Sequence, residues 1–281
     1  MVGEALALAE EGEARVTTRR PGVREARAAP HGGIPGPIWP PTRIPGCVAW
    51  LDMQQTFAET AGTITSIRNM ASGVDWEEAV LGPAYDATGL NGRPAAVPNG
   101  TTQRIISTEA AVLAVFNGDN KAFTAQFAFK VGAFGTAVTW FGLGNSGIAS
   151  NDSYSFERTD ASASVGLRLR KLDDAGTGAA QGGLRLPTAP DILVLTWVCF
   201  GNSADLYLGA SRSNRCSNFS IFTAPATVNV NQAALFARPD SVPDQFFDAP
   251  FGAAVVWDHA LPDAQWRGVA AAMCGRWGIP P

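Results

Sequence analysis

The fold is decided by the last stretch of the chain, residues 251–281, which reads FGAAVVWDHALPDAQWRGVAAAMCGRWGIPP. Its first part is an apolar run that predicts a buried strand, followed by a turn at Asp258-His259. The remainder predicts a helix, because its apolar residues recur at helical spacing. A helix this close to a strand must fold back onto the sheet that holds the strand. The stretch therefore predicts a sheet with a C-terminal helix packed on it.

The two ends of this helix are marked in the sequence. Pro262 is expected at the first helical position, and Asp263 complements the positive end of the helix dipole. The glycines at 275 and 278, followed by two prolines, predict the C-terminal end of the helix.

Upstream of this tail, short apolar segments alternate with turns rich in Gly, Asn, Asp and Pro. Residues 121–131 (KAFTAQFAFKV) predict a half-buried strand with one apolar and one wet face, and residues 191–200 (DILVLTWVCF) predict a central strand. Further strands are expected at 47–53, 63–67, 104–108, 137–143, 154–158, 164–172, 204–208, 219–222, 228–237 and 252–257. No long helix is expected before residue 262. The pattern is typical of a two-sheet antiparallel sandwich.

Three motifs carry a resemblance to a known family. They are CVAWLDM at 47–53, GLNGRPAAVPNG at 89–100 with its Asn91-Gly92 turn, and the final W-D strand followed by ALPDAQ and RWGI. In this order they resemble concanavalin A-like jelly-roll domains of the laminin-G-like group. The resemblance implies an all-β, two-sheet antiparallel jelly-roll sandwich over residues 46–281 with one C-terminal helix. It does not imply a function, because lectins, hydrolases and structural modules all use this fold.

Composition restricts the class of protein. The chain has 281 residues, of which 46% are hydrophobic and 16% charged, so there is material for a sizeable core. Its net charge of -4 gives no basic field for nucleic acid or an anionic membrane. The first thirteen residues carry acids where a secretory signal needs a basic start, and no apolar run reaches roughly eighteen residues. We therefore expect a protein made in the cytoplasm, without nucleic-acid or membrane partners.

Residues 1–45 differ in composition from the rest and predict an extended N-terminal arm. Acids and arginines fill the first part, and six prolines between residues 30 and 45 favour polyproline-like backbone. Such an arm cannot bury a core of its own, so it is either a disordered tail or a device that docks onto a neighbouring subunit. In the docking hypothesis its partner-binding residues are Arg19, Arg20, Ile38 and Trp39.

Catalytic patterns are weak in this sequence. Hydrolases of this fold carry paired carboxylates as E-x-D-x-x-E, a spacing that does not occur here. The nearest clusters, Asp75, Glu77 and Glu78 in an expected loop and Asp173-Asp174 in a Gly-rich turn, are interpreted as solvated turn residues. The two histidines, His31 and His259, are interpreted as surface residues. No catalytic residue is assigned, and the chain is expected not to be an enzyme.

No cofactor is expected, with calcium as the alternative. Laminin-G-like sandwiches often hold calcium at a loop rim through Asp, Asn and carbonyl oxygens. Two sets of residues could supply such oxygens, and each also fits plain turn chemistry: Asn145, Asn151 and Asp152, or Asn117, Asp119 and Asn120. The four cysteines form no C-x-x-C pair and are interpreted as thiols, with a Cys199–Cys216 disulfide as the alternative.

The tryptophans bear on sugar binding, which uses exposed aromatic rings. By their pattern, most of the eight are core residues, namely Trp50, Trp140, Trp197, Trp257, Trp266 and Trp277. Trp39 in the arm and Trp76 in an expected loop are predicted to be exposed. Trp39, flanked by Ile38 and Pro40, suits an anchor in a neighbour's pocket better than a sugar platform.

These features favour a non-enzymatic structural protein. A lone laminin-G-like domain behind a Pro-rich arm resembles minor structural proteins of tailed bacteriophages: head decoration proteins, head fibres or tail-associated adhesins. This resemblance implies a virion location, with other virion proteins and further copies of the chain as partners. The alternative is a lectin-like module that binds cell-surface glycan, and a glycan hydrolase is the third hypothesis.

Overall fold

The structure is a computed structural model that describes residues 35–281 except 56, 119–120, 132–137, 146–152, 162–163, 173–177, 187–191, 202, 212–214, 221–228 and 240–244. The chain divides into two compact units, Met1–Gly33 and Ile34–Pro281. The described residues all belong to the second unit. It includes residues 34–45, which the sequence assigned to the arm, whereas Arg19 and Arg20 lie outside the described residues.

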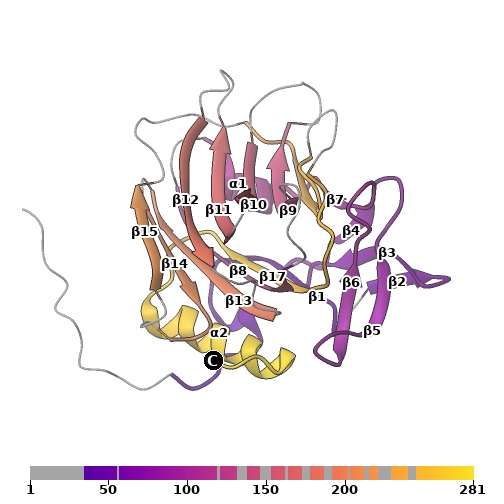
Figure 1. The fold of residues 1–281 in the computed structure, drawn as a ribbon, viewed down its shortest axis with the longest axis horizontal. Coiled ribbons are helices and arrows are strands. Elements are labelled where there is room, and N and C mark those ends of the chain that lie inside the picture. Colours follow the sequence, from indigo (N-terminus) through magenta and orange to yellow (C-terminus); the bar gives the residue numbers. More distant parts are fainter. Residues whose placement is uncertain are drawn as a thin grey trace, which may run out of the picture. The chain divides into compact units, whose positions relative to one another are not determined.

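Antiparallel strands make up most of this unit, and they join into one sheet that curls into two facing layers (Figure 1). The first layer runs in the order β2 (Phe57–Thr60), β3 (Thr63–Arg68), β4 (Asp75–Glu78), β7 (Ile105–Ser107), β16 (Gln232–Leu235), β9 (Val138–Gly144), β10 (Ser153–Ala161), β11 (Ser164–Leu172) and β12 (Gly178–Leu186).

The second layer runs in the order β1 (Cys47–Asp52), β17 (Phe251–Trp257), β8 (Ala122–Lys130), β13 (Ile192–Phe200), β14 (Ser203–Leu208) and β15 (Arg215–Ser220). A hairpin of β5 (Ala84–Leu90) and β6 (Arg93–Val97) joins the layers, since β5 pairs with β3 and β6 pairs with β17. This arrangement confirms the predicted all-β jelly roll.

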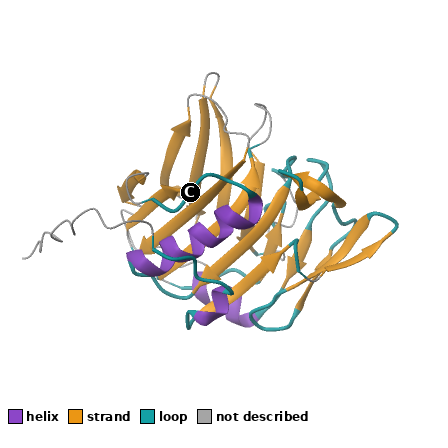
Figure 2. Cartoon of the chain, turned by 90° about the horizontal axis from the view of Figure 1, so that it is seen from below, coloured by secondary structure: helices purple, strands orange, loops and turns teal. Residues whose placement is uncertain are grey.

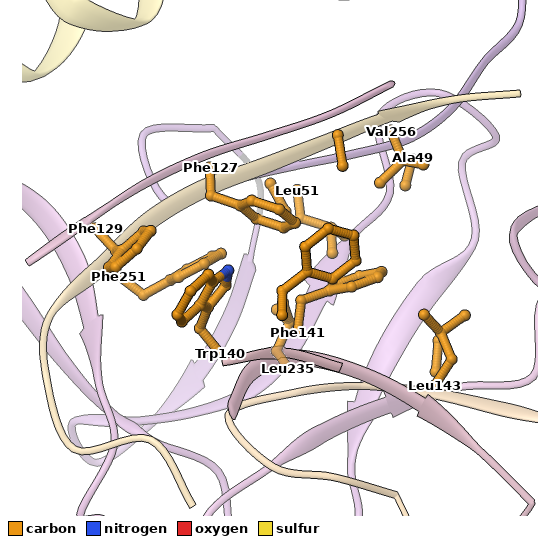
Figure 3. Packing of buried hydrophobic residues seen from close by; sticks show 14 of the residues in the cluster. Ala49, Leu51, Phe127, Phe129, Trp140, Phe141, Leu143, Leu235, Phe251 and Val256 are labelled. Carbon is orange, nitrogen blue, oxygen red and sulfur yellow. The ribbon is translucent and has the colours of Figure 1, made fainter. Parts of the chain in front are cut away.

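The main core fills the space between the layers and is rich in aromatic side chains. Phe127 and Leu51 extend from one layer toward Trp140 and Phe141 of the other (Figure 3). The rings of Phe129 and Trp140 stack with centroids 4.5 Å apart. Burial of these large apolar surfaces is the principal term that stabilises the sandwich.

A second core lies between the outer face of β8, β13 and β17 and the helix α2 (Asp263–Trp277), which crosses these strands in Figure 2. Trp266 of this helix stacks on Tyr207 at 4.3 Å. Gln126 of β8 donates hydrogen bonds to the Thr196 hydroxyl and the Trp266 carbonyl oxygen. The predicted wet face of residues 121–131 is therefore wrong: Thr124, Gln126 and Ala128 are buried because the helix covers them.

The end of α2 connects two of the sequence motifs. Gly278 takes a left-handed conformation with φ of 60°, as expected for a helix stop, and Ile279 N–H bonds to the Cys274 carbonyl. Asn91, in the turn between β5 and β6, donates from its side-chain amide to the carbonyl oxygens of Trp277 and Gly278. Pro262 is the N-cap of the helix rather than its first residue.

Residues 35–45, which we call the strap, pack on the chain's own helix α2. Ile38 N–H donates to the Gly268 carbonyl at 2.9 Å. The Trp39 ring meets Trp50 edge-on at 5.3 Å, and the Arg276 guanidinium lies over it at 4.5 Å. Near its C-terminal end the strap forms a short 3-10 helix, Pro41–Arg43. Ile38 and Trp39 are thus half-buried within their own unit; their role as partner-binding residues stays a prediction.

Several elements were not expected from the sequence. The helix α1 (Ala110–Phe116) was missed, as were β2, β4, β5, β6 and β12. The strand β4 reads DWEE, and three acids in four residues resemble a solvated turn more than a strand. Pairing on both sides, with β3 and β7, holds this segment extended despite its composition.

Candidate functional site

The outer face of the first layer is open over only part of its width. A transverse row of paired residues crosses this face in the order Ser66, Glu77, Ile106, Ala234, Gly142 and Ser155. At one end residues 237–239 pass over Gly142, where an added Cβ would lie 2.8 Å from the Ala237 carbonyl oxygen. Ser155 beside it is fully buried, whereas Glu77 is exposed. The accessible part of this row therefore lies over β3, β4 and β7.

Two adjoining hollows occupy this open part, and we call them together the furrow. The larger has a volume of about 420 Å³ and is lined by Val74, Asp75, Glu77, Glu78 and residues 106–110. The smaller, of about 120 Å³, is lined by Phe57, Ala58, Ser66, Arg68 and Asp75. Asp75 borders both hollows, so a ligand longer than one hollow could extend across them.

Strand alternation explains how β4 presents its acids. Trp76 is fully buried in the main core and stacks near Phe141, with centroids 6.1 Å apart. Since side chains alternate along a strand, Asp75 and Glu77 point to the opposite, outer face. The buried indole thus fixes the strand from which the two carboxylates project.

Glu109 is the most constrained carboxylate of the furrow. Its Oε2 accepts hydrogen bonds from Asn69 Nδ2 at 2.8 Å and from Trp76 Nε1 at 3.3 Å. Its Oε1 has no hydrogen-bond partner among the residues that the structure describes. The side chain is therefore held in one orientation by two hydrogen bonds to one of its oxygens.

Asn69 positions the Glu109 carboxylate and is itself fully buried. Its Oδ1 accepts from the backbone N–H groups of Trp50 and Ala71, and its Nδ2 donates to the Val48 carbonyl as well as to Glu109. The amide thereby connects β1 with Glu109 at the furrow.

The remaining polar groups have distinct partners. Asp75 forms an ion pair with Arg68 at 3.2 Å, and Glu78 accepts a hydrogen bond from Gly82 N–H at 2.8 Å. Ser107 is 7% exposed, and its hydroxyl oxygen accepts a bond from Glu109 N–H at 3.1 Å. The furrow therefore combines carboxylate oxygens, hydroxyl groups and one guanidinium with the apolar surfaces of Val74 and Ile106.

Two expectations for this region are corrected by the structure. Asp75, Glu77 and Glu78 lie on strand β4 and not in a loop, because the neighbouring strands pair with both of its edges. Trp76 is buried and not exposed, since the period-two pattern of β4 directs it into the core. In the sequence, the alternation of Asp75, Trp76 and Glu77 was the pattern that could have indicated a strand with one buried and one exposed face. Asp173 and Asp174 lie outside the described residues.

The six tryptophans expected in the core are all buried, whereas Trp39, predicted to be exposed, is half-buried because it packs against Trp50 and Arg276. Of the residues considered for calcium, Asn117 exchanges hydrogen bonds with the backbone of Val230, and Asn145 accepts one from Asn231. The rest of those residues, Asp119, Asn120, Asn151 and Asp152, lie outside the described ranges. Within those ranges no three His, Cys, Asp or Glu residues gather as a metal site would require.

Cys47, Cys199, Cys274 and His259 are not among the residues that line the furrow. Cys47, Cys199 and Cys274 are free thiols, which excludes the Cys199–Cys216 disulfide in this structure. Burial raises the pKa of Cys47 to about 12 and that of Cys274 to about 11, so both thiols are poor nucleophiles. His259 contacts Asp258 at 2.8 Å in the turn before α2, as a surface residue would.

No protein-family model matches the sequence, and no curated protein does so either. Among solved structures, the chain is similar to the sialidase of Trypanosoma rangeli in complex with sialic acid, at 11% identity and a TM-score of 0.52. That match covers 86% of this chain and 36% of the sialidase, so the chain spans about a third of the larger protein.

Two carbohydrate-binding domains also resemble the chain. The CBM40 of the Ruminococcus gnavus IT-sialidase, bound to alpha2,3 sialyllactose, has 14% identity and a TM-score of 0.48, with 63% of this chain and 95% of that one covered. Domain 4 of a GH43 extracellular arabinanase from Geobacillus stearothermophilus, in complex with arabinotriose, has 17% identity and a TM-score of 0.49, with 80% and 98% covered. At these identities the likeness concerns the fold, a lectin-like jelly roll of the concanavalin A type.

Among the helices in the described part of the chain, none has the length and apolar character that a bilayer crossing requires.

Proposed function

We propose that the jelly-roll unit is a carbohydrate-binding module whose ligand lies in the furrow. The observation that carries this proposal is the open sheet face over β3, β4 and β7, bordered by the fixed carboxylate of Glu109. The sialidase of which one part, 36% of its length, resembles this chain was solved in complex with sialic acid, and a sugar is the ligand class that we propose here.

The furrow suits the chemistry of a saccharide. Each sugar hydroxyl can donate one hydrogen bond and accept others, and an ionised carboxylate accepts at both of its oxygens. Glu109 Oε1 and Glu77 supply such acceptors, while Ser107 and Thr108 supply hydroxyl groups. Ile106 and Val74 offer apolar surface for the C–H faces of a sugar ring. Because Glu109 is already held by Asn69 and Trp76, binding requires little ordering of this side chain.

The same geometry favours binding over hydrolysis. Asp75 and Glu77 project from one strand face, as a glycosidase pair does. A glycosidase, however, keeps one carboxyl protonated by burying it in apolar surroundings. Both of these carboxylates are exposed, and Asp75 is paired with Arg68. We therefore propose a non-catalytic module.

A glycan array probed with the full chain tests the proposal, followed by titration calorimetry on any glycan that binds. Glu109→Gln should weaken binding about ten-fold, because a hydrogen bond to a charged acceptor contributes about 1.5–3 kcal/mol. The matched control is Asp86→Asn on β5, which removes a charge outside the furrow and should leave affinity unchanged. Absence of binding to any glycan, or equal losses in both variants, would contradict the proposal.

We also propose, as a second candidate, that the protein is a virion structural component that docks through its N-terminal arm, residues 1–45, with Arg19, Arg20, Ile38 and Trp39 as partner-binding residues. Ile38 and Trp39 are only half-buried on α2, so each keeps surface that a neighbouring subunit could contact. Replacing Arg19 and Arg20 together with Glu should abolish incorporation into particles, whereas replacing both with Lys should preserve it. Particle incorporation of the Glu variant at the wild-type level would overturn this candidate.

A further inference from the structure

The charges around the furrow are strongly unbalanced. Four carboxylates line it, those of Asp75, Glu77, Glu78 and Glu109, whereas Arg68 is the one cation among its lining residues. Arg68 is already paired with Asp75 at 3.2 Å. The larger hollow, which contains Glu109, is lined by no cation at all. A ligand in that hollow therefore meets negative charge without a compensating group.

Two polar residues that line the larger hollow, Glu109 and Ser107, also have hydrogen-bonding capacity that the described residues do not use. Glu109 presents Oε1 as an acceptor because Asn69 and Trp76 occupy its other oxygen. Ser107 is 7% exposed; its oxygen accepts from Glu109 N–H, and its hydroxyl donates to no acceptor among the described residues. A buried hydroxyl with an unused hydrogen is uncommon unless water or a ligand completes it. This pair matches a sugar hydroxyl, which donates and accepts at the same atom.

We propose that the furrow selects neutral saccharides and rejects anionic ones such as sialylated or uronic glycans. This inference rests on the proposed carbohydrate-binding function and specifies the ligand class for the same site. A sialic acid carboxylate placed within roughly 6 Å of two furrow carboxylates would be repelled enough to weaken binding about ten-fold in a water-like dielectric. A neutral sugar gains the same hydrogen bonds without that repulsion.

The test compares pairs of array glycans that differ by one sialic acid, such as lactose and α2,3-sialyllactose, using the full chain. We take the pair whose neutral glycan binds most tightly. Calorimetry at low ionic strength should show that the chain binds this neutral glycan about ten-fold more tightly than its sialylated partner. Because salt screens exposed charges, the ratio of the affinity for the neutral glycan to that for the sialylated glycan should fall several-fold at about 0.5 M NaCl. Glu77→Gln should narrow it about three-fold, since it removes one of the repelling charges. Asp86→Asn is the control of equal charge and should not change the ratio.

The outcomes separate this inference from the function on which it rests. Equal or tighter binding of the sialylated members, or a ratio that does not respond to Glu77→Gln, overturns the selectivity while carbohydrate binding stands. A chain that binds no member of any pair overturns the proposed function, and the selectivity with it. A preference for neutral members that narrows with salt and with Glu77→Gln supports both.

Discussion

At the scale of single residues, Asn69 shows how one buried amide can stabilise the fold and position the furrow together. It makes four hydrogen bonds, to two backbone N–H groups, to one carbonyl oxygen and to Glu109. A buried polar group is tolerated only when its hydrogen bonds are satisfied, and removing it leaves its partners without theirs.

Asn69→Ala should therefore lower the free energy of unfolding by about 3 kcal/mol, measured by urea denaturation. Asn99→Ala is the matched control. Asn99 also makes several hydrogen bonds to its own loop, but it is exposed, so water can replace them. The control should lose less than about 1 kcal/mol. Equal losses in the two variants would contradict the role of burial.

Asp52 provides a test through pH. Burial raises its pKa above the ordinary value near 3.8, outweighing the nearby Arg276 guanidinium and the hydrogen bond from Gln54 N–H, which lower it. The folded chain thus holds this proton more tightly than the unfolded chain does. The stability that Asp52 contributes is fully present below its unfolded pKa and is lost as the pH rises through its folded pKa.

Unfolding free energies of the wild type and Asp52→Asn, measured in urea at a series of pH values, should show this dependence. The stability of the wild type relative to the variant should fall as the pH rises from about 3.8 and become constant above the folded pKa. A difference that rises over this window would contradict the prediction.

At the scale of elements, the contact between the strap and α2 depends on a glycine. A Cβ at Gly268 would lie 2.7 Å from the Ile38 side chain and 3.1 Å from the Gly36 carbonyl oxygen. Glycine ordinarily destabilises a helix interior by about 1 kcal/mol relative to alanine. Its presence here allows the strap to approach the helix backbone closely.

Gly268→Ala and Gly275→Ala, both in α2, should therefore have different effects. Gly275 has nothing within 4 Å of an added Cβ, so its replacement should raise the free energy of unfolding by up to about 1 kcal/mol. Gly268→Ala should raise the free energy of unfolding by less than Gly275→Ala does, or should lower it. Hydrogen exchange at the Ile38 amide should become faster in this variant. A similar gain in both variants, with Ile38 exchange unchanged, would refute the close contact.

What the sequence could predict at this scale follows from patterning. Residues 251–257 form a continuous apolar run, residues 121–131 alternate, and Pro262, Gly278 and the two final prolines mark the ends of the helix, so these strands and this helix were predicted correctly. The second face of β8 was mispredicted because Thr124 and Gln126 are polar, and only the tertiary contact with α2 shows that they are buried. The furrow was missed because β4 is recognisable as a strand only through its pairing with β3 and β7.

At the scale of the whole molecule, the boundary of the folded unit is a testable quantity. The strap contributes buried surface to the second core through Ile44, which is 4% exposed, and through the half-buried Ile38 and Trp39. A chain lacking residues 1–33 should therefore keep the stability of the full chain, whereas a chain lacking residues 1–45 should lose about 3 kcal/mol. Urea denaturation measures both, and equal stability of the two truncated chains would place the boundary at residue 46 instead.

The strap and the furrow lie on different sides of the main core. Residue 38 contacts α2 behind β8 and β13, whereas the furrow opens on β3 and β4, beyond the buried Trp76. Under the two functions proposed above, an attachment point at the strap would leave the proposed sugar-binding surface on another side of the main core. Copies arranged side by side on a common support would then engage a glycan-coated surface through many sites at once, and avidity would compensate for a weak affinity at each site.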